Sequence, residues 1–266
     1  MRYSIEIVLI LLLVACKKAP ERACWKATGA IENLIVPLSS FQYLSIHPHI
    51  EVALVQDSLD YIEWQAGAHL LPFLSAEIQA DTLQLHNKNG CKFLRYRNGQ
   101  VKAVVHFSSI KELHVSNSDA IQTQQQWFAN DLLIFLKEGV GTVDLNITAQ
   151  KVTVRNNYGW QTLKLSGTVG SLFVDLDGSS SLQAASLLAT DSISFRSISP
   201  RACYISADQL LVKAQLYGAG NLYYHGQPSQ ILKTEYGTGR VLAQWTPSAE
   251  ILVFLRLNSH HENPFI

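Results

Sequence analysis

The sequence predicts an all-β protein whose main part is built as a β-solenoid of short, irregular strands. Three observations predict this class. Apolar and polar residues alternate with a period of two along much of the chain. No stretch combines capping residues with a sustained helical period. Apolar strand starts also recur at nearly constant spacing in the second half.

The period of two is clearest in 50–56, which places Ile50, Val52 and Leu54 on one face. Residues 80–85 and 101–107 read as two further strands. The segment 122–136 has a weak case for a helix, but its β-rich run favours a strand. Asn89–Gly90 and Asn98–Gly99 are tight-turn signals between such runs.

The repeat predicts stacked coils. Its strand starts are spaced by 19, 21, 19 and 19 residues, and each repeat contains a second strand. One coil cannot bury its apolar inner face alone, whereas stacked coils bury a continuous core. An antiparallel sandwich with evenly spaced strands is the alternative. The strand starts are Leu163, Leu182, Cys203, Leu222 and Val241, and the second strands are 172–176, 193–195, 210–214 and 231–233.

The composition limits the classes of partner. Of 266 residues, 47% are apolar and 16% are charged, which fits much buried strand. Lys plus Arg equals Asp plus Glu at 21 each, so the formal net charge is zero. A nucleic-acid-binding protein needs a basic surplus, so we expect no nucleic-acid partner.

The first residues predict export and lipidation. Residues 1–15 carry an early positive charge and an apolar run too short for a permanent membrane helix, as in a signal peptide. The order Leu13-Val14-Ala15-Cys16 resembles the lipobox of bacterial lipoproteins, in which the cysteine is lipidated and becomes the first mature residue. An ordinary secretory signal is the alternative. We therefore expect a membrane anchor at Cys16, followed by a tether over 16–30.

Three cysteines remain for other roles. Export permits disulfides, and we favour a pair between Cys24 and Cys91, with Cys203 as a small buried side chain. Spacing alone cannot pair them, so three unpaired buried thiols remain the alternative. The sequence has neither a CxxC motif nor zinc-like cysteine spacing.

Charged and imidazole side chains do not form a convincing catalytic or metal constellation. Asp175 and Asp177 share one strand face, as carboxylates do in polysaccharide-cleaving β-helices. Val174 and Leu176 are the inward pair, however, so we expect both aspartates to face water. The histidine concentrations are His47 with His49, and His260 with His261, and we expect both to be surface features. We predict no catalytic residue, no metal and no cofactor.

Tyrosines near the glycine-rich coils are the candidates for surface recognition. Exposed aromatic faces stack well on sugars and other flat ligands. Alternate inward and outward packing is the competing interpretation, with one residue of the adjacent pair buried by strand alternation. The four candidates are Tyr217, Tyr223, Tyr224 and Tyr236.

An ordered set of segments resembles the GIN-domain family, called putative auto-transporter adhesin heads. The glycine-rich end is the clearest part, with Gly-Asn-Leu-Tyr-Tyr-His-Gly-Gln-Pro at 220–228 followed by Gly-Thr-Gly at 237–239. The resemblance runs from about residue 24 to 243 and implies a right-handed β-helix-like fold and an envelope location. It implies no known ligand or reaction. The other matching segments are 24–29, 41–56, 83–97 and 203–207.

This chain departs from the family pattern in its worn-down Gly-Ser-Gly turns, as at 167–170, and in its longer tail. We expect the GIN-like solenoid domain to span 31–245. Residues 246–266 then form a capping strand or tail, since a solenoid must hide its last open edge.

The function expected is that of a non-catalytic envelope lipoprotein, most simply on the outer membrane, which binds a glycan or a protein. The alternatives are a carbohydrate-active enzyme on a β-helix, motivated by Asp175 and Asp177 alone, and a structural envelope component that assembles by solenoid stacking. The sequence leaves the membrane face, the ligand and the oligomeric state open.

Overall fold

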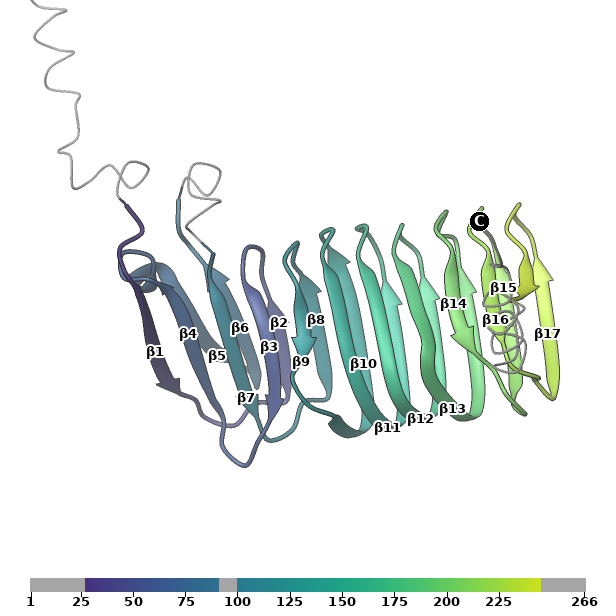
Figure 1. Ribbon diagram of the computed structural model, residues 1–266, viewed down its shortest axis with the longest axis horizontal. Coiled ribbons are helices and arrows are strands. Elements are labelled where there is room, and N and C mark those ends of the chain that lie inside the picture. Colours follow the sequence, from purple (N-terminus) through teal and green to yellow (C-terminus); the bar gives the residue numbers. More distant parts are fainter. Residues whose placement is uncertain (1–26, 91–99, 245–266) are drawn as a thin grey trace, which may run out of the picture. The chain divides into compact units, whose positions relative to one another are not determined.

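A computed structural model describes residues 27–90 and 100–244, and nearly all of their regular structure is β-strand (Figure 1). The chain divides into two compact units. The first extends to Gln125 and includes Gly139–Thr142, and the second comprises Gln126–Glu138 and the chain from Val143 onward. Within the described residues, no helix combines the length and the apolar character needed to cross a bilayer.

The second unit is a β-solenoid whose successive strands pair in parallel (Figure 1). In the pair β12–β13, Leu163 lies opposite Leu182 and Leu172 lies opposite Ile193. This parallel pairing excludes an antiparallel sandwich for the repeats. The strands are β10 (Trp127–Glu138), β11 (Thr142–Asn156), β12 (Thr162–Leu176), β13 (Ser181–Ser197), β14 (Cys203–Ser206), β15 (Leu211–Leu216), β16 (Leu222–His225), β17 (Gln230–Glu235) and β18 (Val241–Ala243).

The predicted repeat is confirmed by this register. Cys203 lies opposite Leu222, and Leu222 lies opposite Val241. With Leu163 and Leu182 these residues are all buried and point into the core. The inner face therefore carries one apolar side chain per coil at the same height, and each side chain is covered by the next coil.

The two strands predicted for each repeat are separate in the later coils, as in β14 and β15. In the earlier coils they are joined, so that the predicted 172–176 is part of a single 15-residue strand, β12. Register shifts between Lys164 and Ser166 and between Val169 and Ser171 bend this strand without ending it. Gly167, with φ of +101°, lies at the bend.

A buried polar ladder crosses the coils of the second unit. The Gln161 side-chain amide donates to the Glu138 carbonyl, and the Ser199 hydroxyl donates to the Ser180 carbonyl at 2.8 Å. The Ser180 hydroxyl in turn donates to Gln161 at 3.4 Å. These polar side chains tolerate burial because each has a partner in a neighbouring coil.

The first unit combines parallel and antiparallel pairs. β2 pairs in parallel with β6 and β8, and β3 pairs in parallel with β7 and β9. β1–β4, β4–β7 and β5–β6 are antiparallel. The strands are β1 (Ile31–Pro37), β2 (Tyr43–Ile46), β3 (Glu51–Gln56), β4 (Tyr61–Gly67), β5 (Leu74–Gln79), β6 (Thr82–Asn87), β7 (Lys102–Phe107), β8 (Glu112–Ser116) and β9 (Ile121–Thr123), with the short 3₁₀-helix η2 (Leu71–Phe73) before β5.

The strands predicted at 50–56, 80–85 and 101–107 are confirmed, with shifted boundaries: the first and the last begin one residue later, at Glu51 and Lys102. The strand predicted to start at residue 80 starts at Thr82, because Ala80 and Asp81 have φ of 47° and 60° and form the tight turn between β5 and β6. The segment 122–136 is β-strand apart from residues 124–126, which separate β9 from β10. Asn98–Gly99 and the tail 246–266 lie outside the described residues.

We predict that Gly167→Ala lowers the free energy of unfolding by about 1–3 kcal/mol, because a side chain at this positive φ is strained. A Cβ atom there would also lie 2.2 Å from the Ile147 carbonyl oxygen. Chemical denaturation of both proteins measures the change. Gly90→Ala is the control, since a Cβ at Gly90 meets nothing within 4 Å. Equal effects of the two substitutions would contradict the role assigned to Gly167.

We also predict that Cys203 resists alkylation in the native protein. Burial raises the pKa of its thiol to about 11, so the reactive thiolate is scarce at pH 8. Iodoacetamide treatment at pH 8, followed by mass spectrometry of the Cys203 peptide, should show modification only after unfolding in guanidinium. Rapid modification of the folded protein would show that this coil opens.

Candidate functional site

Two exposed tyrosines form a stacked pair at one corner of the second unit. Tyr217 follows β15 and Tyr236 follows β17, one coil later. Their ring centroids are 4.6 Å apart with 15° between the planes. The exposed fractions are 41% for Tyr217 and 64% for Tyr236, so both rings are open to a ligand.

Arg196 extends this pair on the outer surface. Its guanidinium carbon lies 5.3 Å from the centroid of the Tyr217 ring, which is a cation–π contact. The same guanidinium donates to Asp177 and to Asp175, and these two hydrogen bonds raise the pKa of Arg196 further above its usual value. The corner thus presents two stacked aromatic rings beside a positioned arginine.

The expectation for Asp175 and Asp177 is confirmed. Val174 and Leu176 are buried, whereas Asp175 is half-buried and Asp177 is exposed. Both carboxylates contact the same arginine, Arg196. This is the arrangement of a surface ion-pair cluster, which neutralises part of the acidic charge along this face.

Tyr223 and Tyr224 do not join the corner. Tyr223 stacks on Tyr204 with centroids 5.2 Å apart, on the strands β14 and β16. The competing interpretation, in which strand alternation buries one residue of the adjacent pair, does not hold, because both are half-buried. Tyr224 lies opposite Ala243 on β18, and an alanine is too small to cover a tyrosine ring.

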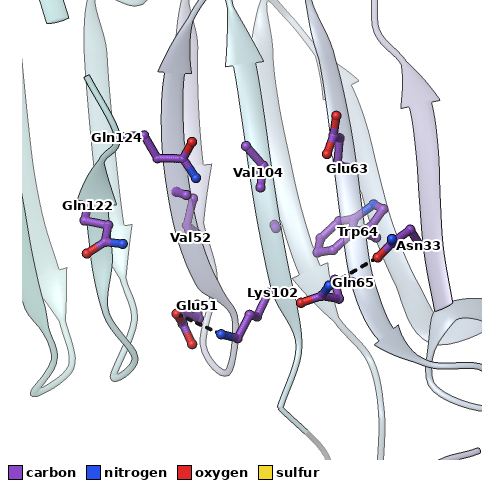
Figure 2. A pocket seen from close by; sticks show the side chains of 12 residues that line it. Asn33, Glu51, Val52, Glu63, Trp64, Gln65, Lys102, Val104, Gln122 and Gln124 are labelled. Atoms are coloured by element: carbon purple, nitrogen blue, oxygen red, sulfur yellow. Dashed lines mark hydrogen bonds and ion pairs between the residues drawn. The ribbon is translucent and has the colours of Figure 1, made fainter. Parts of the chain in front are cut away.

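A polar hollow lies on the outer face of β4, β7, β3 and β9 in the first unit, with a volume of about 340 Å³ (Figure 2). Strand register creates it. Glu63 lies opposite Val104, Val104 opposite Ala53, and Ala53 opposite Gln122. Long polar side chains at the two outer strands therefore flank two small apolar ones at the middle strands.

A second row of polar residues borders the hollow. Asn33 lies opposite Gln65, Gln65 opposite Lys102, and Lys102 opposite Glu51. The Gln65 side-chain amide donates to Asn33 at 3.3 Å, and the Lys102 ammonium lies 3.5 Å from the Glu51 carboxylate (Figure 2). Gln124, which follows β9, is the last polar residue of the lining, and the buried residues Val52, Trp64 and Ala103 contribute the rest.

His106 supports one wall of the hollow. Its imidazole stacks on Tyr61 with centroids 3.9 Å apart, and its two ring nitrogens lie 3.2 Å from Asp57 and 3.8 Å from Glu63. The pKa of Asp57 is lowered, first by the Ser58 backbone amide and then by His106. An ionised Asp57 therefore holds the ring that borders Glu63.

The histidines singled out by the sequence do not build a metal site in the described part of the chain. His47 stacks on His86 with centroids 4.0 Å apart, and His49 is exposed with φ of 71°. Within residues 27–90 and 100–244, no group of three or more His, Cys, Asp or Glu side chains is arranged to hold a metal ion. The pair His260–His261 falls outside these ranges.

The structure tests the predicted role of one cysteine, Cys203. Cys203 is buried and free, as expected. Cys16, Cys24 and Cys91 are not among the described residues, so the predictions for the anchor and for the disulfide remain predictions.

Sequence reasoning missed the hollow and its supporting histidine. The residues of its floor, Ala53 and Val104, are outward positions on strands that lie far apart in sequence. Their small size is visible in the sequence, but a pair of small outward residues indicates a depression only when the register that brings them together is known.

The fold and the sequence agree with one family and several solved structures. The family model described as "Putative auto-transporter adhesin, head GIN domain" matches residues 40–228. None of the curated proteins matches the chain. The similar solved structures have low sequence identity to this chain, so the likeness to them indicates the fold alone.

The similar solved structures include the following three. A putative adhesin from Bacteroides fragilis has a TM-score of 0.68 at 16% identity, over 81% of this chain and 97% of that chain. A protein titled putative lipid binding protein, from Parabacteroides distasonis, has a TM-score of 0.57 at 18% identity, over 82% and 98%. A putative adhesin from Parabacteroides merdae has a TM-score of 0.53 at 15% identity, over 82% and 97%.

Proposed function

The chain belongs to the putative auto-transporter adhesin head GIN-domain family, and from this premise we propose a function for it. It is a non-catalytic envelope protein that presents a rigid binding face to a glycan or a protein. The adhesin description of the family supports a location in the cell envelope or at the cell surface. Two of the similar structures are also titled putative adhesins, and the third is titled putative lipid binding protein.

The observation that carries the binding role is the stacked pair of Tyr217 and Tyr236 beside Arg196. Tyrosine and arginine dominate the energetics of recognition surfaces, because they bring large contact area and directed polar groups at low entropic cost. The pair is held on a parallel ladder, so little conformational entropy remains to be lost on binding.

The two carboxylates that suggested an enzyme support instead a protein without catalytic activity. Glycoside hydrolysis needs two carboxyl groups that flank a sugar at a defined separation. Asp175 and Asp177 instead share the guanidinium of Arg196. The description of the family points the same way, since it names a putative adhesin head and no reaction.

The membrane partner of the proposal is a lipid anchor at Cys16, most simply in the outer membrane. The sequence order Leu-Val-Ala-Cys at 13–16 supports it. Two or three acyl chains hold a protein stably on a bilayer, unlike a single chain. Protease treatment of intact cells would decide whether the domain faces outward, as adhesion to another cell requires.

We expect metabolic labelling with an alkyne fatty acid to mark the protein in its native host, and Cys16→Ala to abolish the label and release the protein from the membrane fraction. Cys24→Ala is the matched control and should keep both the label and the membrane association. An unlabelled wild-type protein would refute the anchor.

We expect the double variant Tyr217→Ala/Tyr236→Ala to reduce binding of the full-length protein by about tenfold or more, on glycan arrays or on arrays of envelope and extracellular proteins. Tyr158→Ala is the control, because Tyr158 is 72% exposed but belongs to a different loop. Unchanged binding by a folded double variant would remove the corner from the proposal, and blank wild-type arrays under varied conditions would refute the binding function.

A further inference from the structure

The hollow on the first unit has the dimensions of a small-ligand site. Glu63 and Gln122 stand on strands three positions apart in the order β4, β7, β3, β9, which is about 14 Å at ordinary strand spacing. Its volume of about 340 Å³ lies at the lower end of the range for small-molecule sites. Val104, which Figure 2 labels, and its strand partner Ala53 give the hollow a small apolar floor between polar walls.

The hydrogen-bonding groups on the rim are of mixed kind. The four carboxamides can both donate and accept, whereas Glu51 and Glu63 accept and Lys102 donates. Hydroxyl groups also do both, so a polyhydroxylated ligand satisfies such a rim in many orientations. A wholly apolar ligand would leave these groups dehydrated without partners, which is unfavourable. The carboxamides are Asn33, Gln65, Gln122 and Gln124.

The charges of the lining select against anions. Two carboxylates, Glu51 and Glu63, face one ammonium group, Lys102, and that ammonium is already paired with Glu51 at 3.5 Å. A phosphate, a sulfate or a uronate would meet uncompensated negative charge at Glu63. A neutral ligand avoids this repulsion.

The lining is held in place before any ligand arrives. All but one of the rim side chains stand on β-strands, and Gln65 with Asn33 and Lys102 with Glu51 are already paired across neighbouring strands. His106 lies between Glu63 and Asp57 and fixes the wall on the β4 side. Preorganised groups lose little entropy on binding, which matters most in a shallow site.

We propose that this hollow binds a neutral saccharide, with one sugar ring seated on Ala53 and Val104 and its hydroxyl groups hydrogen-bonded to the surrounding carboxamides and to Glu63. The apolar C–H face of a pyranose matches the floor, and its hydroxyl edge matches the rim. The site shares no residue with the corner of Tyr217 and Tyr236, so it stands or falls independently of the binding face proposed there.

Titration calorimetry of the full-length protein in detergent tests the site. The probes are neutral cello-, manno-, galacto- and chito-oligosaccharides, compared with heparin and alginate oligosaccharides as anionic probes. We expect at least one neutral probe to bind and the anionic probes not to bind. Val104→Arg, which fills the floor, should weaken binding at least about tenfold, and Gln122→Ala should weaken it by a smaller factor.

Val140→Arg is the matched control, since Val140 is an exposed valine of the first unit that does not line the hollow. Tyr217→Ala/Tyr236→Ala should leave unchanged the binding that Val104→Arg weakens, because the two sites share no residue. Circular dichroism melts establish folding, and if Val104→Arg fails to fold, Gln122→Ala and Gln65→Ala decide the outcome. Failure of all neutral probes to bind, preference for anionic probes, or full binding by folded Val104→Arg would overturn the proposal.

Discussion

The structure depends above all on the in-register parallel stacking of successive coils. In a parallel ladder, a backbone position lies beside its equivalent in the next coil, so a side chain that suits the interior once must suit it in every coil. The series from Leu163 through Leu182, Cys203 and Leu222 to Val241 meets this condition. An inserted residue would turn apolar side chains outward, so insertions are tolerated only at corners and at bends such as those between β12 and β13.

The same stacking governs the outer surface, where it restricts charge. Equivalent outward residues lie side by side at strand spacing, and like charges there are unfavourable, whereas aromatic rings stack favourably. The row that starts at Asp175 accordingly continues with Arg196, and the corner beyond it carries Tyr217 and then Tyr236. A recognition surface of stacked rings is thus a natural product of a solenoid.

The sequence predicted what depends on local repetition. The alternation within strands and the interval between Leu163 and Leu182 revealed both the inward ladder and its period. The sequence could not predict the hollow, because β7 and β3 are adjacent in space but their paired residues Val104 and Ala53 are distant in sequence. Tyr224 shows the same limit, since its half-burial depends on the small partner Ala243 rather than on its own strand.

A rigid surface with shallow sites buries only a small area of any single ligand. Each of the two proposed binding sites is therefore weak by itself. Several copies on one membrane change this balance, because binding by the first copy raises the effective concentration for its neighbours. The proposed anchor at Cys16 would supply that arrangement without any oligomeric interface. On this view the solenoid contributes a rigid, preorganised surface, and the membrane contributes the avidity that an adhesive function needs.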